Sequence, residues 1–203
     1  MNKPVDTGTT VLMVGNPNVG KSALFNRLTG ANAVVSNYPG TTVDYTEGTL
    51  IEAHRTFTII DVPGTYSLTP RDAAEEVAVR LLGEHPDATV LLVLDATRIE
   101  RGLYLTLEVV ERGVPCIIAL NMTDAAHDKR ISVDAAEMER LLGIPVIETT
   151  AISGEGVKRL AGMIRMAKAA DISAIRSRLN GGEPGEERMT IRPGCGGCGL
   201  CVR

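Results

Sequence analysis

The sequence predicts an α/β fold in which helices cover both faces of a mostly parallel six-stranded sheet. Short apolar runs alternate with segments of helical periodicity along most of the 203 residues. Most of these runs are continuously apolar, as in "TVLLVLD", which is typical of strands covered on both faces. Because ligands bind such sheets at the carboxyl ends of the strands, we expect a functional site in the loops that follow them.

The individual elements follow from the residue pattern along the chain. Five β-rich apolar runs predict strands, and a sixth run alternates apolar and polar residues as an edge strand does. The expected strands are residues 9–15, 45–52, 56–61, 89–95, 115–121 and 145–149. Helical spacing predicts helices at about 21–29, 72–83, 103–112, 134–142 and 156–169. In "SVDAAEMERLLG", acidic residues come early and Gly143 ends the pattern, as in an ordinary helix.

The chain is expected to divide into a main domain and a short extension. Residues 1–170 form the α/β domain, and residues 171–203 form a helical extension and a tail rich in Gly and Cys. The stretch "DISAIRSRLN" is compatible with one or two further helical turns. Residues 180–203 contain seven Gly and two Pro, a composition that predicts a flexible tail.

Charge and hydropathy argue against several classes of function. The formal net charge is −4, so no overall basic field attracts nucleic acid or an anionic membrane surface. The longest apolar runs are far shorter than the roughly 20 residues that cross a bilayer. The first ten residues also lack the charged and apolar regions of a secretion signal. We therefore expect a cytoplasmic chain whose thiols stay reduced.

The motif GNPNVGKS, residues 15–22, lies between the first expected strand and the first expected helix. It fits G-x-x-x-x-G-K-[ST], a loop whose backbone N–H groups cradle the β-phosphate of a nucleotide. Gly15 and Gly20 permit the tight wrap, Lys21 adds a positive charge, and the following helix N-terminus favours anions. Ser22 offers a hydroxyl to Mg²⁺. The motif therefore predicts a P-loop, which binds a nucleotide.

Residues for Mg²⁺ and the γ-phosphate are expected on two later segments. The stretch "DVPG", residues 61–64, ends an expected strand. Asp61 at that tip is suited to hold a Mg²⁺-bound water, and Gly64 to offer its N–H to a γ-phosphate. In the intervening loop "NYPGTTVDY", the hydroxyl of either Thr41 or Thr42 completes the Mg²⁺ shell if the loop folds over the nucleotide.

The base is predicted by two further strand ends. Alone, N-x-x-D is more often a helix cap, but here Asn121 and Asp124 follow the strand 115–121. The Asp124 carboxylate can accept hydrogen bonds from N1–H and the 2-amino group of guanine, whereas it repels the lone pair at N1 of adenine. After the next strand, a backbone N–H of Thr150 or Ala151 is placed to meet the guanine O6. Four motifs in this order predict a GTP site and a P-loop GTPase (Ras-like) fold.

These segments resemble the G domain of the ferrous-iron transporter B family, within the translation-factor-related class of small GTPases. The resemblance covers roughly residues 9–168 and extends to sequence outside the generic GTPase motifs. The distinctive stretches are GNPNVGKSALFNRLTG, SNYPGTTVDYTEG, DVPGTYSL, ERGLYLTLEVVERGVPCIIALNMTD and TTAISGEG. Met122, in place of the commoner Lys of N-K-x-D, is another mark of the family.

The resemblance implies roles for individual residues. It favours Thr42 as the Mg²⁺ ligand of switch I, with Asp61 and Gly64 as the switch II pair. It implies that Asn18 coordinates a K⁺ ion that assists hydrolysis. Thr65 stands where Ras-like proteins carry a water-positioning Gln and is too short for that role, so we expect slow intrinsic turnover. We expect Lys21, Thr42 and Gly64 to act in catalysis. The expected nucleotide contacts are Gly15, Asn16, Pro17, Asn18, Val19, Gly20, Lys21, Ser22, Ala23, Gly40, Thr41, Thr42, Asp61, Gly64, Asn121, Met122, Asp124, Thr150 and Ala151.

The resemblance also implies function and partners. It implies that GTP hydrolysis to GDP is a switch that regulates Fe²⁺ uptake through a membrane pore, with the chain at the inner face of the cell membrane through that partner. The family continues with a helical and a polytopic membrane domain, whereas about 35 residues remain here, so the chain is a stand-alone paralogue, a split half or a fragment. A homo-oligomer is compatible with the sequence. The alternative is a soluble module that senses GTP or iron and docks on a transporter with little turnover.

The tail carries a motif that a nucleotide site does not require. Cys195, Cys198 and Cys201 form C-x₂-C-x₂-C, a spacing that lets three thiolates converge on Fe or an Fe–S cluster. The fourth Cys of a ferredoxin-type run is absent, and Cys116 is expected to be buried in a strand. A redox-sensing thiol cluster and a tail without a role remain alternatives.

Overall fold

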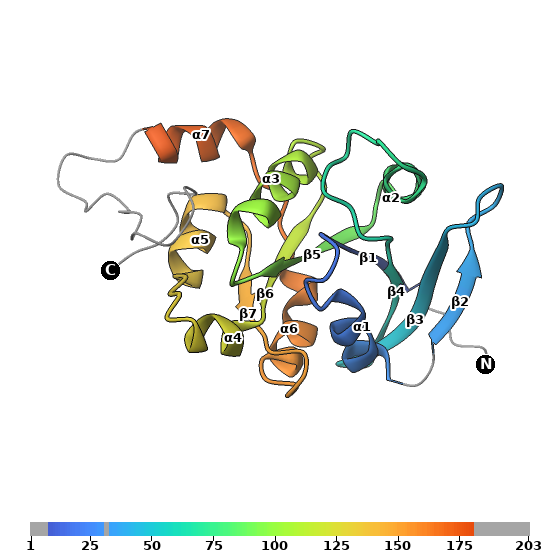
Figure 1. Ribbon diagram of the computed structural model, residues 1–203, viewed down its shortest axis with the longest axis horizontal. Coiled ribbons are helices and arrows are strands. Elements are labelled where there is room, and N and C mark those ends of the chain that lie inside the picture. Colours follow the sequence, from blue (N-terminus) through green and yellow to red (C-terminus); the bar gives the residue numbers. More distant parts are fainter. Residues whose placement is uncertain (1–7, 31–32, 181–203) are drawn as a thin grey trace.

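The computed structural model describes residues 8–30 and 33–180, and these form one α/β body (Figure 1). Its sheet has the strand order β2-β3-β4-β1-β5-β6-β7. Strands β4, β1, β5, β6 and β7 are parallel, and β2 and β3 are antiparallel additions at one edge. The strands are β1 (Thr9–Gly15), β2 (Ala33–Asn37), β3 (Asp44–Glu52), β4 (Arg55–Asp61), β5 (Thr89–Asp95), β6 (Cys116–Asn121) and β7 (Val146–Glu148).

The fold class predicted from the sequence is confirmed, but the described sheet has seven strands instead of six. The additional strand is β2, in a stretch for which the sequence predicted no strand or helix. Four of its five residues are exposed, so its sequence carries no burial pattern to reveal it. It forms by pairing with β3, where Val35 lies opposite Thr46.

The helices are α1 (Lys21–Thr29), α2 (Ala73–Glu84), α3 (Ile99–Val110), α4 (Thr123–Asp128), α5 (Ala135–Leu142), α6 (Val157–Met163) and α7 (Ile172–Asn180). Helix α3 begins four residues before the expected start, because Ile99 is already buried against the sheet. The short helix α4 was not expected, and α6 ends early by passing into a 3₁₀ turn at Ile164–Met166. None of the helices in the described ranges is long and apolar enough to cross a membrane.

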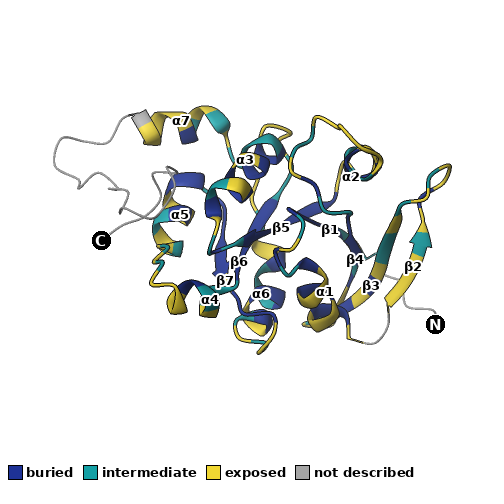
Figure 2. Ribbon diagram, viewed as in Figure 1, coloured by how far each residue is buried: buried dark blue, intermediate teal, exposed yellow. Residues whose placement is uncertain are grey.

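Two apolar layers hold the helices on the sheet. Alternate residues of β1 face opposite sides, so Leu12 and Val14 lie in one cluster and Val11 and Met13 in the other. The first cluster contains buried residues of α2, α3, α5 and α7, and the second those of α1 and α6. Figure 2 shows the central strands as the most deeply buried part of the molecule.

The helical extension expected after residue 170 is α7, and it packs on the α/β body. Its Ile175 side chain is buried in the same cluster as the α5 residues Met138 and Leu142. Arg178 Nη1 donates to the Leu141 carbonyl oxygen at 3.0 Å. The extension is therefore joined to α5 through both apolar and polar contacts.

Candidate functional site

The P-loop lies between β1 and α1, and two of its glycines are required by close approach. Gly20 has a φ of 79°, and a Cβ there would lie 2.4 Å from Asn121 Nδ2. A Cβ on Gly15 would lie 2.6 Å from the Val93 carbonyl oxygen. Asn18 also adopts a left-handed conformation, with φ 66°, which Asn tolerates better than most residues. The backbone is thus wrapped at the carboxyl end of β1.

Three of the predicted site residues come together at the ends of β1 and β4. The Lys21 ammonium forms an ion pair with the Asp61 carboxylate and donates to the Val62 carbonyl oxygen at 2.5 Å. Ser22 Oγ donates to Asp61 Oδ2 at 3.1 Å. Both Lys21 and Asp61 are buried. A hydroxyl and a carboxylate at this spacing are the hard oxygen donors that Mg²⁺ prefers.

The segment after Asp61 is fastened to the P-loop. A Cβ on Gly64 would lie 3.2 Å from Pro17, so the two loops are in contact. The Thr65 N–H donates to the Gly15 carbonyl oxygen at 3.1 Å. The Thr65 side chain is fully buried, and its hydroxyl donates to the Ser67 carbonyl oxygen at 2.7 Å. Thr65 is therefore a structural residue in this arrangement.

Two glutamates that the sequence did not single out organise the loop after Gly64. The buried Glu75 carboxylate accepts from the N–H groups of Tyr66 at 3.2 Å and Arg71 at 2.9 Å. Glu108 on α3 accepts from Ser67 Oγ at 3.0 Å and the Leu68 N–H at 2.7 Å. The first had a sequence signal, because Asp72 and Glu75 have the spacing of a helix-capping box. For Glu108 no local signal exists.

The turn between β2 and β3, residues 38–43, lies away from the P-loop. It is at the upper right end of Figure 1, beside α2 and two strands from β1. The Tyr38 ring is buried in the core cluster of α2, and its hydroxyl donates to the Glu84 carboxylate. That hydrogen bond is the main cause of a raised Tyr38 pKa. The turn closes through Thr41, whose N–H donates to the Tyr38 carbonyl oxygen at 3.1 Å.

This placement differs from the one expected for a Mg²⁺ ligand. Thr42 is exposed on the turn, and among the described residues no hydrogen bond joins Gly40, Thr41 or Thr42 to Ser22 or Asp61. The physical reason is Tyr38, because burial of its ring holds the turn against α2. A role of Thr42 in binding Mg²⁺ stays a prediction and requires the turn to move.

Asn121 joins the P-loop to the two strand ends expected at the base. Its side-chain Nδ2 donates to the Val19 carbonyl oxygen at 2.9 Å. Its Oδ1 accepts from Thr149 Oγ1 at 3.2 Å and from the Ala151 N–H at 3.0 Å. The side chain is 1% exposed and all of these partners lie inside the protein. Asn121 therefore links the P-loop, the end of β6 and the loop 149–151 by hydrogen bonds.

The remaining residues expected at the base are on the segments that Asn121 links. Asp124 is exposed in the first turn of α4, and Met122 has a φ of 63°. The Thr150 N–H donates to the Glu155 carbonyl oxygen at 3.0 Å, and the Ala151 N–H is bound to Asn121. Both N–H groups expected to meet guanine O6 are therefore engaged within the protein.

Arg27 on α1 is a site residue that sequence reasoning missed. Its Nε donates to the Ala151 carbonyl oxygen at 3.1 Å, and its Nη2 donates to the carbonyl oxygen of Ile152. A Cβ on Gly154 would lie 3.2 Å from Arg27 Nη1. The loop 151–154 is thus held on the helix that starts in the P-loop. An exposed Arg on a helix carries no local sequence signal for such a contact.

The cysteines expected to bind iron, Cys195, Cys198 and Cys201, lie outside the described residues. Cys116 is buried in β6 as expected, and burial raises its pKa to about 12. Its Sγ donates to the Val114 carbonyl oxygen at 3.2 Å. Within the residues that the structure describes, no group of three His, Cys, Asp or Glu side chains is arranged to hold a metal ion.

Comparisons with known proteins agree on one family. The family model described as "Ferrous iron transport protein B" matches residues 9–164. A curated relative, the Fe(2+) transporter FeoB of Salmonella typhimurium, is 39% identical over 155 residues, which are 74% of this chain and 20% of the relative. The chain thus spans about a fifth of the length of that relative.

Two solved structures have the same fold. The cytosolic domain of the T. maritima FeoB iron transporter in apo form has a TM-score of 0.76 at 38% identity, over 81% of this chain and 67% of that one. The same domain in GMPPNP form has a TM-score of 0.73 at 39% identity, over 78% of this chain and 63% of that one.

Proposed function

This chain belongs to the ferrous iron transport protein B family, and we propose that it binds GTP and hydrolyses it to GDP as a switch that regulates ferrous iron transport. The carrying observation is the assembly of Lys21, Ser22 and Asp61 at the carboxyl ends of β1 and β4. A cytosolic domain similar to this chain has been solved in GMPPNP form, which supports a guanine nucleotide as the ligand.

The phosphates are proposed to bind in the wrap between Gly15 and Gly20, with Lys21 as the nearest charge. When a nucleotide binds, the Lys21 ammonium leaves the Asp61 carboxylate and pairs with a phosphate, so it keeps an anionic partner. Ser22 Oγ and the freed Asp61 carboxylate are the residues that would hold Mg²⁺, Asp61 through a bound water. When bound, Mg²⁺ neutralises charge that develops on the phosphate oxygens.

The base is proposed to bind beside Asn121, with Asp124 as the selective group. The exposed Asp124 carboxylate is free to accept from N1–H and the 2-amino group of guanine. Asn121 holds the P-loop and the loop 149–151 at fixed separation, so the base and phosphate contacts are made together. A contact between guanine O6 and a backbone N–H requires one of the bonds of Thr150 or Ala151 to open.

The switch is proposed to be the turn 38–43. In the described state it is held on α2 by Tyr38 and Glu84, and release carries Thr42 toward Ser22 and Asp61. The turn leaves β3 two residues beyond Thr46, which pairs with Asp61, so it starts from the same edge of the sheet as the P-loop. An equilibrium between these positions is a two-state element that a γ-phosphate can bias.

Hydrolysis is proposed to be slow without an additional cation. The Thr65 hydroxyl is engaged by Ser67 and is fully buried, so it does not position a water. The exposed Asn18 side chain, on the P-loop itself, offers an amide oxygen to a K⁺ ion between protein and phosphates. The same observations on Thr65 and Thr42 favour the second candidate, a GTP-sensing module with little turnover.

The regulated partner is proposed to be a membrane pore for Fe²⁺, with this chain on the cytoplasmic side. The similar solved domains are described as cytosolic, and the curated relatives are Fe(2+) transporters about five times the length of the matched region. The residues 1–170 and 171–180 are proposed to act as one unit, because Ile175 of α7 is buried against α5.

Single-turnover GTP cleavage tests the proposal. We expect slow cleavage that is faster in K⁺ than in Na⁺, and loss of both binding and cleavage in Lys21→Ala. The matched control is Lys158→Ala, because Lys158 is exposed on α6 and is not among the expected nucleotide contacts. Absence of GTP binding contradicts the proposal. Tight binding without cleavage in either cation supports the sensing module.

A further inference from the structure

A pocket lies beside the P-loop. It shares Asn16, Pro17, Asn18, Val19 and Met122 with the expected nucleotide contacts, but its other lining residues lie outside that set. Its volume is about 260 Å³, and it opens between the P-loop, the loop after Gly64 and the N-terminal parts of α3 and α4. Its lining includes Asn16, Tyr66, Asp95, Arg98, Arg101 and Lys129. Lys21, Ser22, Asp61 and Asp124 do not line it. We propose that this pocket binds a compact oxyanion of the phosphate or carboxylate class next to a nucleotide bound in the P-loop.

The first observation is an unpaired amide at the pocket wall. The Asn16 side chain is 4% exposed, and neither its Nδ2 nor its Oδ1 has a hydrogen-bond partner among the described residues. Buried polar side chains are nearly always paired, because an unpaired one loses its hydration without compensation. An oxyanion in the pocket supplies acceptors for Nδ2, and a protonated oxygen or a water carried with it supplies a donor for Oδ1.

The second observation is the charge of the wall. Arg98, Arg101 and Lys129 line the pocket, and within the described part of the chain none of them forms an ion pair. The one carboxylate in the lining is Asp95, and its Oδ1 already accepts from the Thr97 N–H at 2.7 Å. Three cations against one carboxylate favour an anionic ligand.

The third observation is the start of α3. This helix has 12 residues, and its N-cap, Arg98, forms no side-chain capping bond. The first N–H groups of a helix have no partner inside the helix, and the helix dipole adds positive potential there. The amide of Asn16, two guanidinium groups and an uncapped helix start thus converge on one small pocket, which is the donor set of an oxyanion site.

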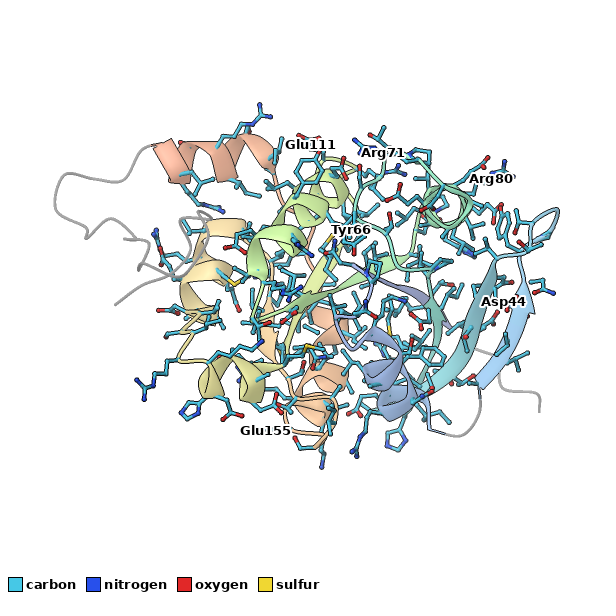
Figure 3. All side chains as sticks on the ribbon, viewed as in Figure 1. Asp44, Tyr66, Arg71, Arg80, Glu111 and Glu155 are labelled. Carbon is cyan, nitrogen blue, oxygen red and sulfur yellow. The ribbon has the colours of Figure 1, made fainter. Side chains whose placement is uncertain are left out.

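The pocket is also joined to the loop that follows Gly64. Tyr66, labelled in Figure 3, is 50% exposed at its edge, and its N–H is held by Glu75. An oxyanion in the pocket therefore contacts a segment that touches the P-loop through Gly64 and Thr65. Inorganic phosphate or a small carboxylate metabolite both have this chemistry.

Solution NMR of the full 203-residue chain tests the site. The protein is saturated with Mg²⁺ and GDP so that the P-loop is filled, and inorganic phosphate or malonate is titrated in. We expect saturable shifts of the Asn16 side-chain amide and of the residues at the start of α3. Asn16→Ala and Arg101→Gln are each expected to raise the dissociation constant for the probe about fivefold to tenfold. Arg112→Gln, which removes the same charge from the exposed region after α3, is the matched control and leaves it unchanged.

Each outcome decides the proposal. Saturation by phosphate alone supports a phosphate-class ligand, and saturation by malonate alone or by both supports the carboxylate class or oxyanions in general. Absence of saturation by either probe, or equal affinity in Asn16→Ala and Arg101→Gln, overturns it. GDP loading is measured separately, and the titration is repeated without nucleotide, so a failure of the GTP proposal does not mask this result.

A second variant guards against misfolding. Asn16→Leu keeps the number and branching of the side-chain heavy atoms and has no unpaired amide, so it is expected to unfold at the same or higher temperature than the parent chain in buffer without probes. Phosphate or malonate is then expected to raise the unfolding temperature of the parent and not of this variant. A folded Asn16→Leu protein that is stabilised by the probe as strongly as the parent overturns the proposal.

Discussion

Asn121 Nδ2 lies 2.9 Å from the Val19 carbonyl oxygen and joins strand β6 to the P-loop across 102 residues of sequence. With its bonds from Thr149 and Ala151, this side chain connects the P-loop, the end of β6 and the loop 149–151 by hydrogen bonds. We therefore expect Asn121 to hold these loops in position in the absence of nucleotide.

Replacing Asn121 by Ala is expected to destabilise the protein by about 3 kcal/mol, because it leaves the Val19, Thr149 and Ala151 groups buried without a partner. Urea unfolding followed by circular dichroism measures the loss. Asn26→Ala, at an exposed position of α1, is the control and stays within about 0.5 kcal/mol of the parent. A loss below 1 kcal/mol, of order one neutral hydrogen bond, contradicts the assigned role.

Changing Asp124 to Asn is expected to exchange guanine for xanthine. The Asn carbonyl accepts only one of the two guanine donors, whereas its NH₂ can donate to the xanthine O2. Affinity for GDP falls about a hundredfold and affinity for xanthosine diphosphate rises. Equilibrium fluorescence titration with both nucleotides reads this out. Asp128→Asn, exposed at the end of α4, serves as the control. Equal losses for both nucleotides argue against a base contact.

Arg27→Ala is expected to loosen the loop 151–154 and weaken GDP binding about tenfold, chiefly by faster dissociation. The reason is the loss of two charge-assisted hydrogen bonds to the Ala151 and Ile152 carbonyls. Stopped-flow displacement of a fluorescent GDP measures the rate. Arg159→Ala, exposed on α6, controls for the lost charge. An unchanged dissociation rate contradicts the assignment of Arg27 as a positioning residue.

Tyr38→Phe tests the proposed switch. The ring stays buried, but the hydroxyl that donates to Glu84 is removed, so the turn 38–43 leaves α2 more readily. Affinity for GMPPNP relative to GDP is expected to rise about tenfold, which corresponds to about 1.5 kcal/mol for one hydrogen bond to a charged group. Tyr45→Phe is the control, since Tyr45 contacts the Tyr38 ring edge-on and forms no hydrogen bond with Glu84 among the described residues. If the ratio of GMPPNP affinity to GDP affinity equals that of the parent, the Tyr38 hydroxyl does not hold the turn 38–43 on α2.

Cys116 is expected to make stability fall at alkaline pH. Its folded-state pKa of about 12 lies above the unfolded value near 8.5, so the thiol's contribution is complete below about pH 8.5 and is lost as pH rises toward 12. The slope is about 1.4 kcal/mol per pH unit for one group. The parent for this test is a triple variant in which Cys195, Cys198 and Cys201 are all replaced by Ser. Urea unfolding between pH 8 and 10.5 measures the free energy of unfolding of this variant with and without Cys116→Ala. Identical slopes in the two chains contradict the burial argument.

The elements that the sequence predicted correctly are those with a local pattern. β1, β5 and β6 are continuously apolar because helices cover both faces, and the glycines of the P-loop are required by contacts at its own ends. The edge strand β2 had no such pattern, since pairing with β3 and not burial forms it. The contact of Ser22 and Lys21 with Asp61 followed from strand adjacency and is present.

By itself the sequence determined the fold class, the positions of the P-loop and of the 61–64 and 121–124 motifs, and the burial of Cys116, because each depends on residues close together in the chain. Only the tertiary structure decided that Tyr38 holds the Thr42 turn on α2, that Arg27 carries the loop 151–154, and that Asn16 is buried without a partner. Those relationships depend on which segments, 40 residues or more apart, pack against one another, and short-range periodicity contains no information on that packing.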